Sequence, residues 1–237
     1  MTHPVVAALR SASAEERLAA CAQAAEDPSA VLLVDPLVAA LADRDARVVR
    51  AATRALEQIG REHDAVLVAL RPALRSQDPR HRFEAAWTWA RLEPPPIKLL
   101  PAVVSALGDL DGDARWRAAR LLLELARIHG EVAPVVGNLV AADQPARVRA
   151  IGLAALRALE PGGELTRSAH LAASREADVE LARLALLGLA GLAAPTSEVW
   201  QRFAAVAASH ADPTCRQIAA RALERRSGTG VEEQIVE

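Results

Sequence analysis

The chain has 237 residues, 51% of them hydrophobic, and a formal net charge of −2 at pH 7. A charge this close to zero excludes a polycation that coats nucleic acid. The apolar residues are mostly Ala, Leu and Val, with no Tyr and two Phe, which favours packed helices over strands. Arg or Asp interrupts each apolar stretch before it reaches the ~20 residues that a membrane span requires.

The two cysteines, Cys21 and Cys215, lie near opposite ends of the chain and show no metal-ligand spacing. We therefore expect reduced thiols and no internal disulfide. The first residues do not combine a basic segment with an apolar run, so no signal peptide is expected. Together these features predict a cytoplasmic protein.

The predicted helices come in pairs along the chain. Residues 4–26 are expected to form the first pair, an N-terminal cap within residues 1–28. After it, an apolar helix, a short polar turn and a second helix recur about every 32 to 37 residues. Further first helices of pairs are expected at 34–42, 65–75, 97–108 and 132–141. Asp is a good helix cap and Pro suits the first helical position, so we interpret Asp45, Asp78 and Asp212 as caps.

The second helices share one pattern of apolar residues. Its clearest copy has Val48, Ala52, Ala55, Leu56 and Ile59, which lie on one face of a helix. The pattern returns after shifts of 33, 66, about 100 and 167 residues. The copy around residues 178–189 is degenerate, and its register stays open by a residue or two.

Two segments carry a resemblance to a known family. Residues 45–56 read D-x-x-V-x-R-x-A-x-x-A-L and residues 212–223 read D-P-x-x-R-x-x-A-x-x-A-L. The chain resembles HEAT-repeat proteins, and it is also similar to the bacterial HEAT-like repeats named after phycobilisome lyases, although nothing in it supports bilin attachment. The resemblance implies an all-α fold: a right-handed α-α superhelix, or HEAT/armadillo-type solenoid, of about seven helical hairpins.

The expected domain organisation follows from stacking, because one hairpin cannot bury its apolar face alone. Residues 1–227 are expected to form a single solenoid, with the cap at 1–28 and HEAT-like repeats at 29–227. Residues 228–237 have no place in the repeat and are expected to form a flexible tail.

The resemblance implies that the second helices line a concave surface. Residues two, six and nine places after the Val48 position point away from the apolar stripe, and several of them are aromatic or Arg. Both residue types are enriched where proteins bind one another. The predicted binding residues are Arg50, Arg54, Phe83, Trp87, Trp116, Arg120 and Arg157. The alternative is that these aromatics pack inside an irregular repeat.

These observations favour a non-catalytic scaffold or adaptor that binds a protein or peptide on its concave surface. The alternative is a DNA-binding protein or a relative of the HEAT-like alkylpurine DNA glycosylases, since Trp87, Trp116 and Asp113 lie on that side. That family looks rich in Lys and Tyr, whereas this chain has one Lys and no Tyr, so nucleic acid is the less expected partner. A regulatory or immunity-type module is a third interpretation that sequence does not separate from the first. No catalytic residue, metal, cofactor or membrane contact is predicted, and His81 is interpreted as a packed histidine.

Overall fold

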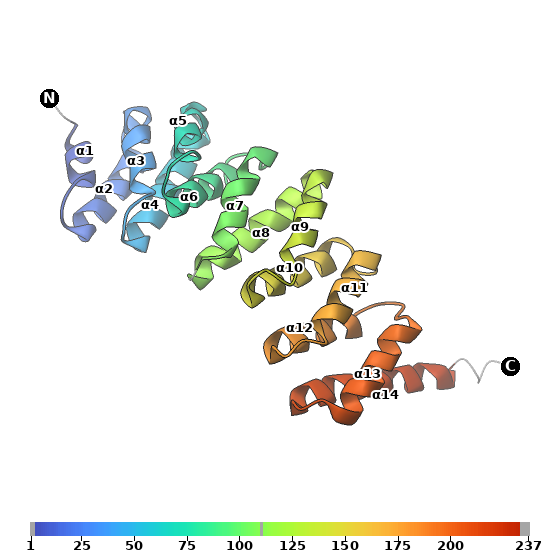
Figure 1. Cartoon of the computed structure of the whole chain (residues 1–237). Helices are drawn as coiled ribbons and strands as arrows, with labels where there is room; N and C mark the ends of the chain where they lie inside the picture. Colours follow the sequence, from blue (N-terminus) through green and yellow to red (C-terminus); the bar gives the residue numbers. More distant parts are fainter. Residues whose placement is uncertain (1–2, 110, 233–237) are drawn as a thin grey trace. The chain divides into compact units, whose positions relative to one another are not determined.

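The structure, a computed structural model, describes residues 3–109 and 111–232. Over these residues the chain forms fourteen α-helices and three short 3-10 helices, with no strand (Figure 1). Consecutive α-helices pack against each other as seven hairpins. The predicted all-α fold of about seven hairpins is therefore confirmed.

Contacts between helices divide the chain into two units, one ending at Ile128 and the other starting at His129. The first unit has four hairpins, and short 3-10 helices, Ala30–Leu33 and Ile97–Leu99, precede the second and the fourth. Its helices are α1 (Pro4–Leu9), α2 (Ala14–Glu26), α3 (Val34–Ala40), α4 (Ala46–Gly60), α5 (Ala65–Ala73), α6 (Pro79–Ala90), α7 (Leu100–Leu107) and α8 (Gly112–Ile128).

The second unit has three hairpins and begins with the 3-10 helix Gly130–Val132. Its helices are α9 (Ala133–Leu139), α10 (Ala146–Leu159), α11 (Glu164–Ala173), α12 (Val179–Ala190), α13 (Ser197–Ser209) and α14 (Pro213–Glu232). The predicted single solenoid stays a prediction. The predicted tail at 228–237 overlaps the end of α14, and residues 233–237 lie outside the described part of the chain.

Within each unit the second helices of successive hairpins contact one another, and this layer carries much of the core. In the first unit α2 contacts α4, α4 contacts α6, and α6 contacts α8. The predicted stripe of α4 is buried throughout, from Val48 at 0% exposed to Ile59 at 4%. A stripe at this spacing buries one face of the helix, so the apolar period sets how each second helix is oriented.

The second helices begin at regular intervals. Their first residues from α4 to α14 are Ala46, Pro79, Gly112, Ala146, Val179 and Pro213, so consecutive starts are 33 or 34 residues apart. This regularity fixes the register that the sequence left open at α12. There Leu181, Ala185 and Leu189 are buried at the positions equivalent to the α4 stripe.

Polar side chains form hydrogen bonds at the turns inside several hairpins. Asp45 and Asp78 accept hydrogen bonds from backbone N–H groups in the first turns of α4 and α6, at 2.8 and 2.9 Å, and Asp212 accepts one from Cys215 at 2.8 Å. The three predicted caps are confirmed. Arg82 donates to the carbonyl oxygens of the turn before α6 at 2.8 and 3.0 Å, which satisfies groups that a helix end leaves unpaired.

Both cysteines are free and buried. Desolvation by burial raises the pKa of each thiol to about 11. Among the described helices, none combines the length and apolar character needed to cross a bilayer.

Candidate functional site

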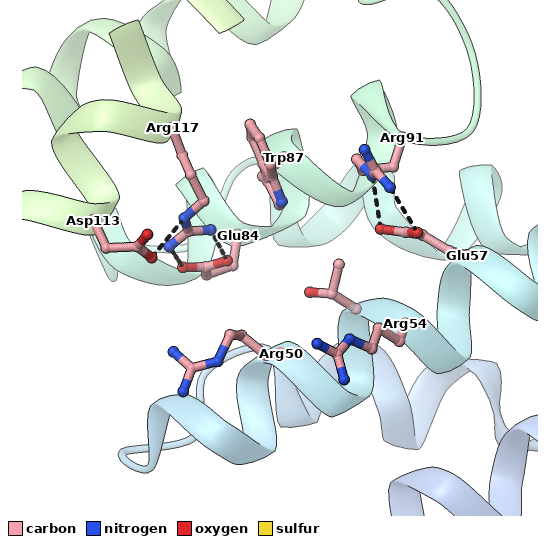
Figure 2. A pocket seen from close by; sticks show the side chains of 9 residues that line it. Arg50, Arg54, Glu57, Glu84, Trp87, Arg91, Asp113 and Arg117 are labelled. Atoms are coloured by element: carbon pink, nitrogen blue, oxygen red, sulfur yellow. Dashed lines mark hydrogen bonds and ion pairs between the residues drawn. The ribbon is translucent and has the colours of Figure 1, made fainter. Parts of the chain in front are cut away.

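Three second helices of the first unit, α4, α6 and α8, form a pocket of about 320 Å³. The pocket lies on the surface where the sequence places the binding residues, and Figure 2 shows it from close by. Its lining is unusually rich in charge for so small a space. The lining residues are Arg50, Thr53, Arg54, Glu57, Glu84, Trp87, Arg91, Asp113 and Arg117.

One side of the pocket is closed by an ion pair between α6 and α8. Arg117 donates to both carboxylate oxygens of Glu84, at 2.8 and 2.7 Å, and its Nε donates to Asp113 at 3.1 Å. Glu84 is 3% exposed. Burial opposes the charge on Arg117, but its hydrogen bonds and attraction to the two carboxylates outweigh this, so the pKa of the guanidinium is raised. The two helices are therefore joined by a charged pair shielded from water.

A second ion pair lies on the opposite side of Trp87. Arg91 donates to Glu57 across the α4–α6 contact, at 2.9 and 3.4 Å. The hydrogen bonds and charge of Glu57 raise the pKa of Arg91. The Arg91 side chain is 52% exposed, so water screens this pair far more than the pair of Arg117.

Trp87 stands between the two ion pairs, as Figure 2 shows. The guanidinium carbon of Arg117 lies 5.4 Å from the centre of its ring and 5.1 Å from that of Phe83. Both separations are within the range of a cation–π contact. One arginine thus ties the buried carboxylate to two aromatic rings, which restricts the orientation of the indole in the pocket.

Arg50 and Arg54 make up the third side of the pocket. Both side chains are exposed, and both line the pocket from α4 (Figure 2). Within the described residues neither has an acidic side chain within ion-pair distance, in contrast to Arg91 and Arg117. The lining has four arginines and three acids, so its net charge is +1, and Arg50 and Arg54 are the arginines outside its ion pairs among the described residues.

The expectation that Phe83 faces solvent is wrong: it is 1% exposed. The helical spacing correctly predicted that Phe83 points away from the apolar stripe of its own hairpin. However, α8 of the next hairpin packs against α6 on that side, and Arg117 covers the ring. The neighbouring Trp87 is only partly buried, since it lies closer to the pocket opening.

The other predicted binding residues, Trp116, Arg120 and Arg157, lie outside the pocket. Trp116 is 56% exposed, and Arg120 lies over its ring at 4.8 Å, but neither lines the pocket. They form a second exposed pair on α8. Arg157 is exposed on α10 of the second unit. The role of all these residues in binding stays a prediction.

Sequence reasoning missed Glu84, Arg91 and Arg117, which hold the pocket together. A signal for them does exist, because acid and arginine in each pair are separated by about one repeat. The separation is 33 residues for Arg117 and Glu84 and 34 for Arg91 and Glu57. Opposite charges one repeat apart on successive second helices therefore indicate cross-helix ion pairs.

Neither a protein-family model nor a curated protein matches the chain. Solved structures do. The chain is similar to an archaeal HEAT-like repeats protein from Thermococcus onnurineus NA1, with a TM-score of 0.51 and 16% identity over 92% of this chain and 94% of that one. It is similar to a chain in a homology model of the full-length AP-3 complex, with a TM-score of 0.56 and 16% identity over 96% of this chain but 45% of that one.

A weaker similarity, with a TM-score of 0.40, links it to the complex of CpcE and CpcF of phycocyanin lyase from Nostoc sp. PCC7120, at 20% identity over 95% of this chain and 88% of that one. The likeness to the Thermococcus protein confirms the predicted resemblance to HEAT-repeat proteins at the level of the fold.

Proposed function

Because the chain has the fold of HEAT-like repeat proteins, we propose that it is a non-catalytic scaffold or adaptor that binds a segment of a protein partner. The surface formed by the second helices of the first unit is the proposed binding surface. The observation that carries the proposal is the pocket in which Trp87, held by Arg117, stands beside the exposed Arg50 and Arg54.

The chemistry of this surface suits protein recognition. Trp and Arg dominate the energetics of protein interfaces because they offer a large contact area with a polar or charged end. Trp87 is partly buried and so is already ordered before a partner arrives, which lowers the entropy lost on binding. The exposed Trp116 with Arg120 offers a second anchor on the same unit.

The proposal that the protein is not an enzyme rests on the state of its reactive groups. The three acids of the pocket all form ion pairs with arginine: Glu84 and Asp113 with Arg117, and Glu57 with Arg91. A carboxylate held in an ion pair is a weak general base. Both thiols are buried with a pKa of about 11, so neither is an effective nucleophile at neutral pH.

A second candidate function, DNA binding, has one observation in its favour: Trp87, Asp113 and Arg54 line the same pocket. Duplex DNA binding depends steeply on salt because bound phosphates release counterions. Fluorescence anisotropy with a labelled duplex at low and moderate salt tests this candidate directly. Binding that falls steeply with salt, and that is lost in Arg54→Glu, supports DNA as the ligand.

The adaptor proposal is tested by selecting random displayed peptides on the immobilised full chain. The selected peptides are then measured against Trp87→Ala, Trp116→Ala and the wild-type protein. We expect peptides that bind the wild type and lose at least tenfold affinity in Trp87→Ala. Circular dichroism must show that the variant retains its helices. If no peptide is selected, or if Trp87→Ala binds every selected peptide as the wild type does, the pocket is not a peptide-binding site.

A further inference from the structure

We infer that the pocket recognises an acidic segment of the partner, in which a Glu or Asp carboxylate lies between Arg50 and Arg54 while a neighbouring apolar side chain packs on Trp87. This inference rests on the proposed function, because it names the chemistry of the partner at the same pocket. It is carried by charge complementarity, by the position of Trp87, and by the arrangement of the arginines.

The pairing of charges in the pocket leaves two arginines over. Arg117 is paired with two acids, Glu84 and Asp113, and Arg91 is paired with one, Glu57. With all four arginines counted, the lining has a net charge of +1. Arg50 and Arg54 have no acidic partner among the described residues, although they line the same pocket. An incoming carboxylate is the group that would complete the pattern that the pocket's other arginines already follow.

The position of these two arginines also carries a cost to the free protein. They are four residues apart on α4, so their side chains lie on the same face of the helix, about one turn apart. Like charges at this spacing destabilise a helix. A bound carboxylate placed between them converts this repulsion into two charge-assisted hydrogen bonds.

The apolar part of the site is the ring of Trp87, and it favours a segment that is not only acidic. The pocket reaches from α4 across α6 to α8. Neighbouring packed helices lie about 8–10 Å apart, so the pocket spans about 20 Å, the length of about six extended residues. Arg54 also lines a groove of about 490 Å³ between α2 and α4. A longer segment can therefore continue past Arg54 along the same unit.

A basic segment does not fit this pocket, because the lining has a net charge of +1 and each of its acids is already paired with an arginine. A nucleic-acid phosphate shares the anionic chemistry of a carboxylate. It is treated as an outcome of the test.

The experiment uses the full chain and three labelled probes: a peptide of paired glutamates separated by leucines, the same peptide with glutamine in place of glutamate, and a duplex DNA of unrelated sequence. Affinities are measured by fluorescence anisotropy for the wild type, for Arg50→Gln/Arg54→Gln, and for the matched control Arg71→Gln/Arg75→Gln. Arg71 and Arg75 are also exposed and four residues apart, but they line neither this pocket nor the groove between α2 and α4. The control removes the same charge from a different surface.

We expect the glutamate peptide to bind at least tenfold more tightly than the glutamine peptide. Two exposed charge pairs account for about a tenfold effect. Arg50→Gln/Arg54→Gln should remove this preference, whereas Arg71→Gln/Arg75→Gln should change the affinity less than about twofold. Equal losses in the two double variants overturn the inference, because they show a response to net charge and not to this pocket.

Two further outcomes also overturn it. The first is duplex DNA binding more tightly than the glutamate peptide and losing affinity in Arg50→Gln/Arg54→Gln, which identifies a phosphate ligand. The second is display-selected peptides that need Trp87 but bind Arg50→Gln/Arg54→Gln and wild type equally. In that case the pocket binds peptides as proposed, and only its preference for acidic segments is wrong.

Discussion

Replacing Arg117 by methionine should destabilise the first unit by about 3–5 kcal/mol, the usual cost of breaking a buried ion pair by removing one partner. The magnitude follows from the burial of Glu84, which is 3% exposed and accepts two hydrogen bonds from Arg117. Without the guanidinium this carboxylate stays buried with no cation. Methionine keeps most of the apolar stem of Arg117 but removes the guanidinium that lies over Phe83 and Trp87. The loss therefore measures the interactions of the charged group more than cavity formation.

Two further variants separate this explanation from a general loss of packing. Glu84→Met/Arg117→Met removes both charges and should recover most of the lost stability, because an apolar pair of similar volume often replaces a buried ion pair at little cost. Arg91→Met breaks the pair with Glu57 in the same pocket. Since Arg91 is 52% exposed, that change should cost at most about 1 kcal/mol.

The assay is urea unfolding followed by tryptophan fluorescence in a Trp200→Phe background. The three remaining tryptophans all lie before residue 129, so the signal reports the first unit alone. An Arg117→Met protein that loses no more stability than Arg91→Met would refute the reasoning. It would mean that the Glu84 carboxylate is screened by water in solution, and that the wall of the pocket is open.

The remaining predictions concern burial elsewhere. Burial lowers the pKa of His170, so the unfolded chain binds a proton at this residue more readily than the folded chain does. Stability should therefore fall as the pH drops below about 6.5, by at most about 1.4 kcal/mol per pH unit. Urea unfolding of His170→Gln at several pH values should show a smaller change of stability with pH. In Gly188→Ala the methyl group would overlap the His170 ring and cost about 1–3 kcal/mol, whereas Gly162→Ala meets nothing within 4 Å and should leave the melting temperature nearly unchanged. Cys21 and Cys215 should react with a thiol reagent only after local opening, and single-cysteine variants should show whether the two units open at the same rate.

Much of the fold could be predicted from the sequence because it depends on local patterns. The apolar stripe of Val48, Ala52, Leu56 and Ile59 has the period of a helix, and Asp45 marks its first turn through a short-range hydrogen bond. The same features recur at intervals of one repeat, so hairpins and their core faces follow from residues close together in the chain. These residues are buried as expected.

The candidate site could be predicted only in part, because it depends on contacts between hairpins. Helical spacing determines which way Phe83 points from its own helix, but only the packing of α8 against α6 decides that the ring is covered. In the same way, sequence identifies Arg50, Arg54 and Arg117 as charged residues of second helices without showing which of them find a carboxylate. Tertiary structure brings Glu84 to Arg117 across 33 residues of chain. It leaves Arg50 and Arg54 without an acidic partner in the part of the chain that the structure describes. The physical reason is that a helix period is a property of one segment, whereas burial and charge pairing are properties of the neighbours that stacking supplies.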